Sequence, residues 1–159
     1  MLYFALIFPR ILYGIEVYAN TYLTYLHDLM ILNNRLLRIL QHRNLSTNIS
    51  EFYAFCGTLP INILFKFQIL LHAHNIFYKS EKLPKNFHVD RLTNTDVHNY
   101  STRSSQDFHR SFENSVYGCK ISTNLYSKFW NSLPLNLKST SSILLFKKQL
   151  KLFLYSNVS

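Results

Sequence analysis

Apolar residues recur at helical spacing in the first 79 and the last 34 residues of this chain, and a polar stretch separates the two parts. The clearest helix is predicted between Thr21 and Arg43, because leucines recur there every three or four residues. The members of this predicted stripe are Leu26, Leu29, Leu36 and Leu40, with Asn33 as its one polar interruption. Since strand faces alternate every second residue, this period predicts a mainly α-helical chain.

Proline, glycine and polar residues divide the chain into three predicted segments. Pro9 lacks the amide hydrogen that a helix interior needs, so a kink or boundary is expected there. Residues 1–79 are predicted to form a helical segment that ends with a strongly apolar helix over 61–78. Residues 80–125 are rich in Asn, Ser, Thr and His without sustained periodicity, which predicts a long extended loop.

Residues 126–159 combine aromatic residues with a final amphipathic helix, which Ser141 or Ser142 can cap. The apolar stripe of this helix is predicted to contain Ile143, Phe146, Leu150 and Phe153. The predicted fold is therefore an irregular helical bundle with a long polar loop and a C-terminal amphipathic basic helix.

The last part of the chain is basic and carries no acidic residue after Glu113, within an overall net charge of +9. The six lysines that follow Glu113 are Lys120, Lys128, Lys138, Lys147, Lys148 and Lys151. Such an unbalanced tail suits contact with a polyanion, either a nucleic acid or an anionic membrane surface.

Two basic groups are candidate phosphate contacts. Arg35 and Arg38 lie three residues apart on one predicted helix and could hold consecutive phosphates. Lys147, Lys148 and Lys151 flank the final apolar stripe and could follow a nucleic-acid backbone. The alternative for both groups is an ordinary solvated helix face.

A third candidate lies in the polar stretch, where Tyr100 could stack on a base while Arg103 contacts a phosphate. Alternatively, Tyr100 packs on the helical core and Arg103 fixes the loop. Trp130, Asn131 and Pro134 are predicted to be structural: the indole docks the tail, and the Asn131 amide satisfies backbone groups of a turn.

No catalytic or metal site is predicted in this chain. His72 and His74 are two residues apart, so a helix would point them in different directions. Cys56 and Cys119 are far apart and are expected to be reduced intracellular thiols. The three glycines are isolated, which excludes a glycine-rich phosphate loop. We also expect no stable membrane insertion, because Arg10 and Glu16 interrupt the apolar start of the chain.

Several motifs, in order, resemble the C-terminal end of the reverse-transcriptase polyprotein of LINE-type, non-LTR retrotransposons. The matching residues are Leu2-Tyr3, Pro9, Leu12-Tyr13-Gly14, Leu29 to Ile39, Ser46-Thr47-Asn48, Leu83-Pro84, His98 to Arg103, Phe129-Trp130-Asn131-Ser132-Leu133-Pro134 and Phe146 to Lys151. The matches cover nearly the whole chain. The chain departs from the pattern at Tyr18, where the family usually has Trp, at Asn33, where it usually has Gln, and at Glu113, in a stretch that is usually basic.

The resemblance implies thumb-like and post-polymerase helices that hold template RNA and the DNA primer beside an upstream reverse-transcriptase palm. The palm of such enzymes carries paired aspartates that bind Mg²⁺. This chain has no Asp-Asp pair, so we expect no polymerase activity, no cofactor and no Mg²⁺ site in it. An intracellular location, in cytoplasm and nucleus, is expected.

Two alternatives remain open. In the first, the segment packs against the polymerase core and touches no nucleic acid. In the second, it is a membrane-surface protein that uses its apolar start and its basic tail as two anchors.

Overall fold

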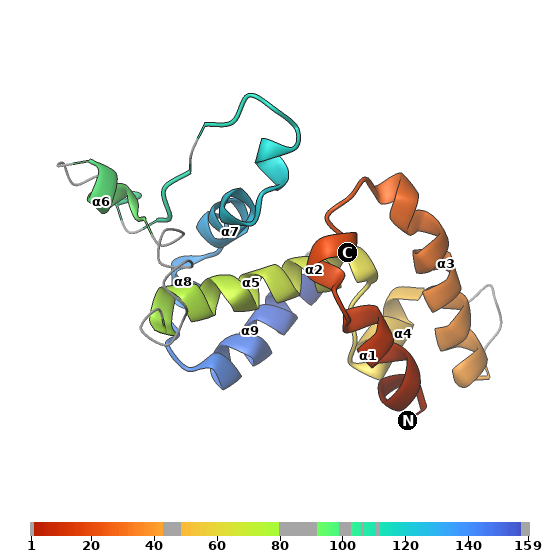
Figure 1. Cartoon of the computed structure of the whole chain (residues 1–159). Coiled ribbons are helices and arrows are strands. Elements are labelled where there is room, and N and C mark those ends of the chain that lie inside the picture. Colours follow the sequence, from red (N-terminus) through yellow and green to blue (C-terminus); the bar gives the residue numbers. More distant parts are fainter. Residues whose placement is uncertain are drawn as a thin grey trace. The chain divides into compact units, whose positions relative to one another are not determined.

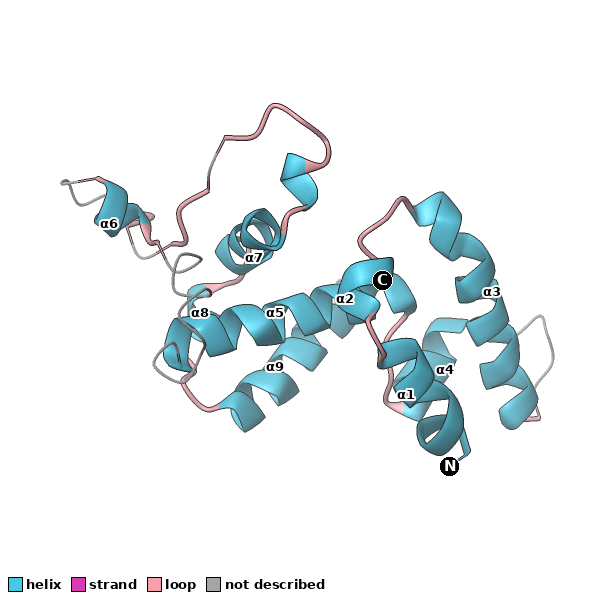
Figure 2. Ribbon diagram, viewed as in Figure 1, coloured by secondary structure: helices cyan, strands magenta, loops and turns pink. Residues whose placement is uncertain are grey.

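The computed structural model describes residues 2–42, 49–79, 92–98, 103–105, 107–110 and 112–156. The described chain is mainly α-helical and contains no strand, which confirms the predicted fold class (Figure 2). Two compact units are present: unit 1 comprises Met1–Gln68 with Leu152–Ser159, and unit 2 comprises Ile69–Lys151 (Figure 1). The boundaries of the two units differ from those of the three predicted segments, because unit 2 joins the described part of residues 80–125 with parts of the helices on both sides of it.

Unit 1 begins with three short helical elements. The π-helical turn η1 (Tyr3–Ile7) runs into α1 (Phe8–Leu12), and Pro9 stands in the first turn of α1, next to the irregular π-helical turn. Gly14, with φ of 66°, supplies the left-handed residue that starts α2 (Ile15–Tyr18). The unit continues through α3 (Leu23–Leu40), α4 (Ile49–Cys56) and the first part of α5 (Ile61–Lys79).

The buried face of α3 differs from the predicted stripe. It contains Leu26, Asn33 and Leu37, whereas Leu40 is 37% exposed. The predicted stripe treated Asn33 as an interruption, but the Asn33 amide lies at the centre of the buried face. Leu37, and not the predicted Leu36, is the leucine buried beside it. The reason is a set of hydrogen bonds that pattern reasoning could not anticipate.

A buried polar network joins η1, α3 and α4 around the Asn33 amide. The Tyr3 hydroxyl donates to Asn33 Oδ1 at 3.1 Å, and Asn33 Nδ2 donates to the Tyr53 hydroxyl at 3.0 Å. The Tyr53 hydroxyl donates in turn to Asn34 Oδ1 at 2.5 Å. The Tyr155 hydroxyl, from the end of the last helix, donates to the backbone oxygen of Tyr53 at 3.1 Å. Because both ends of the Asn33 amide are satisfied, burying it costs little.

Unit 2 contains the rest of α5, then α6 (Asn94–Val97), the 3-10 turn η4 (Gly118–Lys120), α7 (Ser122–Asn131), α8 (Leu135–Lys138) and most of α9 (Ile143–Ser156). Thr93 and Phe108 form an isolated antiparallel bridge. Where it is described, the predicted loop over 80–125 therefore carries short helices, and α7 begins at Ser122, before the predicted end of that loop.

An aromatic cluster forms the core of unit 2. Trp130, which is 1% exposed, has its ring centroid within 5.2 to 6.3 Å of those of Phe77, Phe108, Phe146 and His74. The His74 imidazole stacks on Phe146 at 4.4 Å, and its Nε2 donates to the backbone oxygen of Thr140 at 2.8 Å. The cluster thereby joins α5, α7, α9 and the segment around Phe108.

The Asn131 side chain holds Phe108 in this cluster. Its Oδ1 accepts the Phe108 N–H at 3.1 Å, and its Nδ2 donates to the Phe108 carbonyl oxygen at 2.9 Å. The amide thus imitates the peptide group of a neighbouring strand. Beside it, Ser127 Oγ donates to the His109 backbone oxygen at 3.0 Å, and Lys138 Nζ donates to Asp107 Oδ1 at 2.8 Å. Three side chains therefore fasten residues 107–109 to α7 and α8.

The last helix, α9, packs through Phe146 and Leu150, which are fully buried, and Leu154, which is 7% exposed. The predicted C-terminal amphipathic helix is therefore present. None of the helices in the described ranges combines the length and the hydrophobicity that crossing a membrane requires.

Replacing Asn131 by Ala should lower the free energy of unfolding by about 1–3 kcal/mol, because both backbone groups of Phe108 lose their partners in a buried setting. Asn136, an exposed residue of α8, provides the matched control, and Asn136→Ala should change stability by less than about 0.5 kcal/mol. Urea unfolding followed by far-UV circular dichroism measures both. Equal stability of the two variants would contradict the fastening role of the amide.

Alkaline pH should destabilise unit 1 through Tyr53. Burial raises the pKa of the Tyr53 phenol to about 12, while the phenol of the unfolded chain ionises near 10. A pKa raised on folding stabilises the folded state fully below pH 10, and this stabilisation is lost as the pH rises toward 12.

The measurement is urea unfolding of the unchanged chain, Tyr53→Phe and Tyr13→Phe at a series of pH values from about 9 to 11.5. Tyr53→Phe should be less stable at pH 9, because its hydrogen bonds to Asn33 and Asn34 are lost, and should lose less stability than the unchanged chain as pH rises. Tyr13 is 87% exposed, so Tyr13→Phe should follow the unchanged chain. Parallel pH profiles for all three would refute the assignment.

Candidate nucleic-acid interface

Helix α9 presents lysines on a surface whose orientation its buried residues fix. Phe146 and Leu150 are fully buried, so the intervening Lys147 and Lys148 are held in solvent. Lys151 is half-buried, and desolvation lowers the pKa of its ammonium group. The three lysines predicted to contact phosphate therefore lie within two turns of one helix, and Lys147 and Lys148 are exposed.

The solvated side of α9 also carries apolar residues. Leu144 is 75% exposed and Leu145 is 56% exposed, immediately before Lys147 and Lys148. This part of α9 is therefore a mixed apolar and basic surface, which suits contact with sugar and base edges as well as with phosphate. The same mixture suits an anionic lipid surface.

Lys138, another lysine of the tail, has a structural partner. Its ammonium group donates to Asp107 Oδ1 at 2.8 Å and to the backbone oxygen of Asn131 at 3.1 Å, with only 14% of the side chain exposed. No acidic residue follows Glu113 in the sequence, but Asp107 reaches Lys138 from the preceding segment and neutralises this lysine of the tail.

The two predicted arginines of α3 do not form a matched pair. Arg35 is exposed, whereas Arg38 is half-buried with its Nε atom shielded from solvent. The Arg38 charge acts on the Tyr53 phenol, where it partly opposes the effect of burial on the pKa. Arg38 is therefore partly buried in unit 1 whereas Arg35 is exposed, so the two arginines stand in different settings and their joint contact with consecutive phosphates stays a prediction. These arginines belong to unit 1 and the α9 lysines to unit 2.

Of the predicted pair in the polar stretch, Tyr100 lies outside the described residues. Arg103 is exposed at the start of a turn over residues 103–105. This turn is fastened to α6, because Asn94 Nδ2 donates to the Ser104 oxygen at 2.8 Å and Thr95 Oγ1 donates to the Ser105 oxygen at 2.6 Å. Arg103 is thus an exposed cation on a hydrogen-bonded support.

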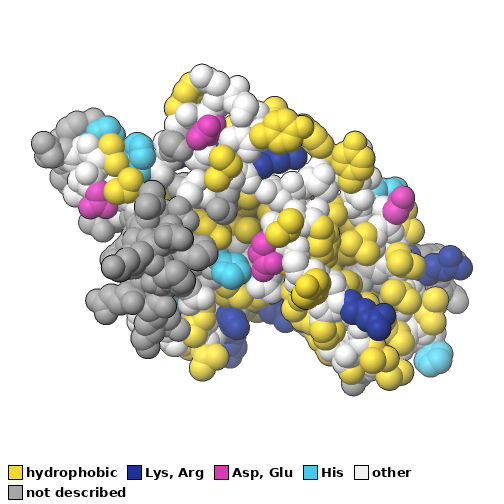
Figure 3. Space-filling view, in the orientation of Figure 1, with side chains coloured by type: hydrophobic (Ala, Val, Ile, Leu, Met, Phe, Trp, Pro, Cys, Tyr) yellow, Lys and Arg dark blue, Asp and Glu magenta, His cyan; other side chains and the backbone are white. Residues whose placement is uncertain are grey.

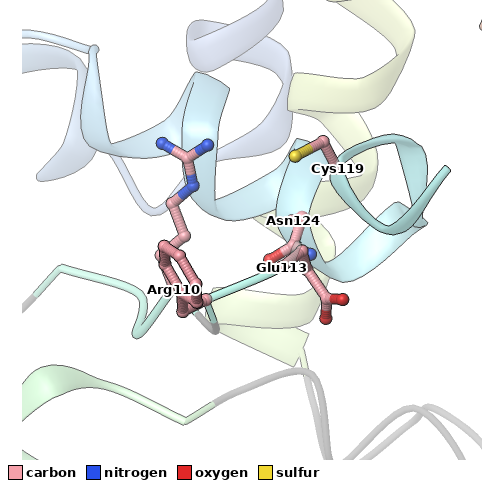
Figure 4. A pocket seen from close by; sticks show the side chains of 5 residues that line it. Arg110, Glu113, Cys119 and Asn124 are labelled. Carbon is pink, nitrogen blue, oxygen red and sulfur yellow. The ribbon is translucent and has the colours of Figure 1, made fainter. Parts of the chain in front are cut away.

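A pocket of about 360 Å³ lies beside η4 and α7 (Figure 4). It is lined by Arg110, Phe112, Glu113, Cys119 and Asn124. Its wall depends on Gly118, since a Cβ atom at that position would lie 2.5 Å from Glu113 Oε2. Asn124, which is buried, donates to the Gly118 oxygen at 3.0 Å and holds η4 against α7.

The mouth of this pocket offers an aromatic ring and two charges of opposite sign. The Phe112 ring is 90% exposed, and the nearby Tyr117 ring is 86% exposed. In Figure 4 the Arg110 guanidinium and the Glu113 carboxylate point in different directions from neighbouring parts of the chain. An exposed ring can stack on a base, a guanidinium can meet a phosphate, and a carboxylate can accept from a base amino group or a ribose hydroxyl.

Sequence reasoning missed Arg110, Phe112 and Tyr117. A signal existed, because Phe108 and Phe112 flank His109 and Arg110 inside an otherwise polar stretch. The pattern could not tell which rings are exposed: Phe108 is 1% exposed in the aromatic core, whereas Phe112 is almost fully solvated.

The described aspartates have structural partners or stand apart. Asp107 pairs with Lys138, and Asp96 accepts from the Thr93 backbone N–H at 2.8 Å in the capping box of α6. Within the described ranges, no three His, Cys, Asp or Glu side chains gather closely enough to hold a metal ion. Both cysteines are free thiols.

Comparisons of the chain with protein-family models, with curated proteins and with solved structures find no match in any of the three. The functional inference therefore depends on the residues described above.

Proposed function

We propose that unit 2 binds single-stranded RNA and that the chain is the non-catalytic C-terminal part of a LINE-type RNA-directed DNA polymerase. One observation carries the proposal: Lys147 and Lys148 are solvated on a helix whose buried residues fix its orientation. No acidic residue follows Glu113 in the sequence. A fixed cationic surface of this kind attracts a phosphate backbone independently of base sequence.

The Arg110 and Phe112 side chains would provide a second contact. Base stacking on an aromatic ring contributes about 1–3 kcal/mol per base and tolerates any base. Stacking on Phe112 would hold a nucleotide in place, and the Arg110 guanidinium would neutralise its phosphate. Arg103 would extend the cationic surface, while Arg35 and Arg38 are less well suited because only one of them is solvated.

In this proposal the upstream palm would supply the metal-binding aspartates, and this chain would hold template RNA and the DNA primer. The motifs that resemble the retrotransposon family support the assignment to a polymerase, and the lysines of α9 support the contact with its template. The packing alternative differs in one respect, because it requires no affinity of the chain for RNA.

A second candidate function is association with an anionic membrane surface. The exposed Leu144 and Leu145 beside Lys147 and Lys148 favour it, since interfacial helices combine apolar and basic residues in this way. Vesicles with and without phosphatidylserine distinguish the two functions: a membrane protein would bind anionic vesicles more tightly than RNA.

Replacing Lys147 and Lys148 by Gln should weaken binding to a labelled single-stranded RNA. The logarithmic salt slope should fall by about 1.4, since each neutralised phosphate contributes about 0.7 on single strands. Fluorescence anisotropy across a salt series measures both quantities, and Lys151→Gln, added as a third change, should lower the slope further. Arg10→Gln with Lys66→Gln removes the same charge from exposed residues of unit 1 and should leave the slope unchanged.

Absence of RNA binding at low salt by the folded chain would overturn the proposal. Equal loss of RNA affinity in the two double variants would also overturn the proposal, because it would show that RNA binding depends on the net charge of the chain and not on the α9 lysines.

Phe112→Ala should lower RNA affinity roughly 5- to 150-fold, the equivalent of about 1–3 kcal/mol for one stacked base, without changing the salt slope. Arg110→Gln should instead lower the slope by about 0.7. Tyr13→Ala removes an equally exposed ring from unit 1 and is the matched control. If Phe112→Ala binds RNA as tightly as the control, the pocket takes no part in binding.

A further inference from the structure

Helix α3 carries an exposed stripe on the face away from its buried residues. The buried face contains Leu26, Asn33 and Leu37. At 3.6 residues per turn, the far side carries residues three and four positions apart. They are Tyr25, Asp28, Leu32, Arg35 and Ile39, and together with the adjacent Ile31 we name them the α3 stripe.

Every member of the α3 stripe is exposed. The exposed fractions are 76% for Tyr25, 50% for Ile31, 54% for Leu32 and 58% for Ile39. The Asp28 side chain is fully exposed, and Arg35 is exposed as well. Figure 3 shows hydrophobic side chains gathered over α1 and α3, with charged side chains between them. Single exposed apolar residues are normal, but four on one helical face indicate a contact surface.

The charges of the stripe are placed symmetrically about its apolar centre. Asp28 lies three and a half positions before the midpoint between Ile31 and Leu32, and Arg35 lies three and a half positions after it. At 1.5 Å per residue, each charge is about 5 Å from this midpoint along the helix axis. Tyr25 and Ile39 stand at nearly equal distances farther out.

A two-fold axis through this midpoint makes the stripe complementary to itself. It places Asp28 opposite Arg35 of a second copy, and Arg35 opposite Asp28 of that copy. It also brings the two Ile31-Leu32 centres together and sets Tyr25 against Ile39 of the second copy. Self-complementarity of this kind is what an interface between identical chains requires.

We propose that the α3 stripe pairs antiparallel with the α3 stripe of a second copy of this chain. The Asp28 carboxylate lies 3.8 Å from His27 Nδ1 and is fully exposed, so it is accessible to an arginine of a second copy. A single pair of helices buries less than the roughly 800 Å² per partner of a standard interface, so the dimer is weak, with Kd of about 10–1,000 µM. This pairing does not depend on the RNA-binding proposal.

Sedimentation velocity of the full chain over about 5–500 µM tests the pairing. The average mass should rise with concentration toward that of a dimer. Asp28→Arg and Arg35→Asp each place like charges opposite one another and should weaken association at least about tenfold. An equal mixture of the two variants should associate again, because the mixed dimer restores both ion pairs, and so should the double variant.

Arg10→Asp makes the same charge change as Arg35→Asp on an exposed residue of α1 and should leave association unchanged. Far-UV circular dichroism of each variant confirms that the helices remain. A chain that stays monomeric throughout the concentration range would overturn the proposal. So would a mixture that fails to associate, or single variants that associate as well as the unchanged chain.

Discussion

The pairing of the Asn131 side chain with the backbone of Phe108 is the interaction on which unit 2 depends. A segment with little regular structure has few backbone partners of its own, and an unpaired N–H or C=O near an aromatic core is costly. The Asn131 amide supplies both partners at once, at 3.1 and 2.9 Å. The Phe108 ring can then enter the cluster around Trp130. Lys138 and Ser127 hold Asp107 and His109 in place. These two residues connect the turn over 103–105 with the pocket that begins at Arg110, so both are attached to a fixed segment.

Periodicity in the sequence was sufficient to predict the longer helices and the amphipathic tail, since both follow from local spacing, but not the short helices that lie within residues 80–125. It was not sufficient to choose the buried face of α3. Pattern reasoning treats an asparagine as an interruption, but Asn33 is buried, because Tyr3 and Tyr53 come from distant parts of the chain to satisfy it. The partner of Lys138 could not be found by local spacing for the same physical reason: Asp107 precedes it by 31 residues.

The candidate site was only partly accessible from the sequence. Lysines on α9 could be placed in solvent, because the neighbouring apolar stripe determines the orientation of the helix. The exposed ring of Phe112 could not be distinguished from the buried ring of Phe108, four residues earlier, since exposure there depends on tertiary hydrogen bonds. Arg35 was grouped with Arg38 by spacing alone. The structure separates them and gives Arg35 a different setting, between apolar residues and one helical heptad from an exposed carboxylate.

Trp130 has a further consequence for studying this chain in solution. It is the one tryptophan of the sequence, and it lies in unit 2 with 1% of its surface exposed. Its fluorescence emission therefore reports on unit 2 alone. The emission maximum lies at short wavelength while the aromatic core excludes water, and it shifts to longer wavelength when water enters the core. Unit 1 contains no tryptophan, so the unfolding of unit 1 does not change the tryptophan emission directly. A difference between the emission transition and the helical signal would resolve the order in which the two units unfold.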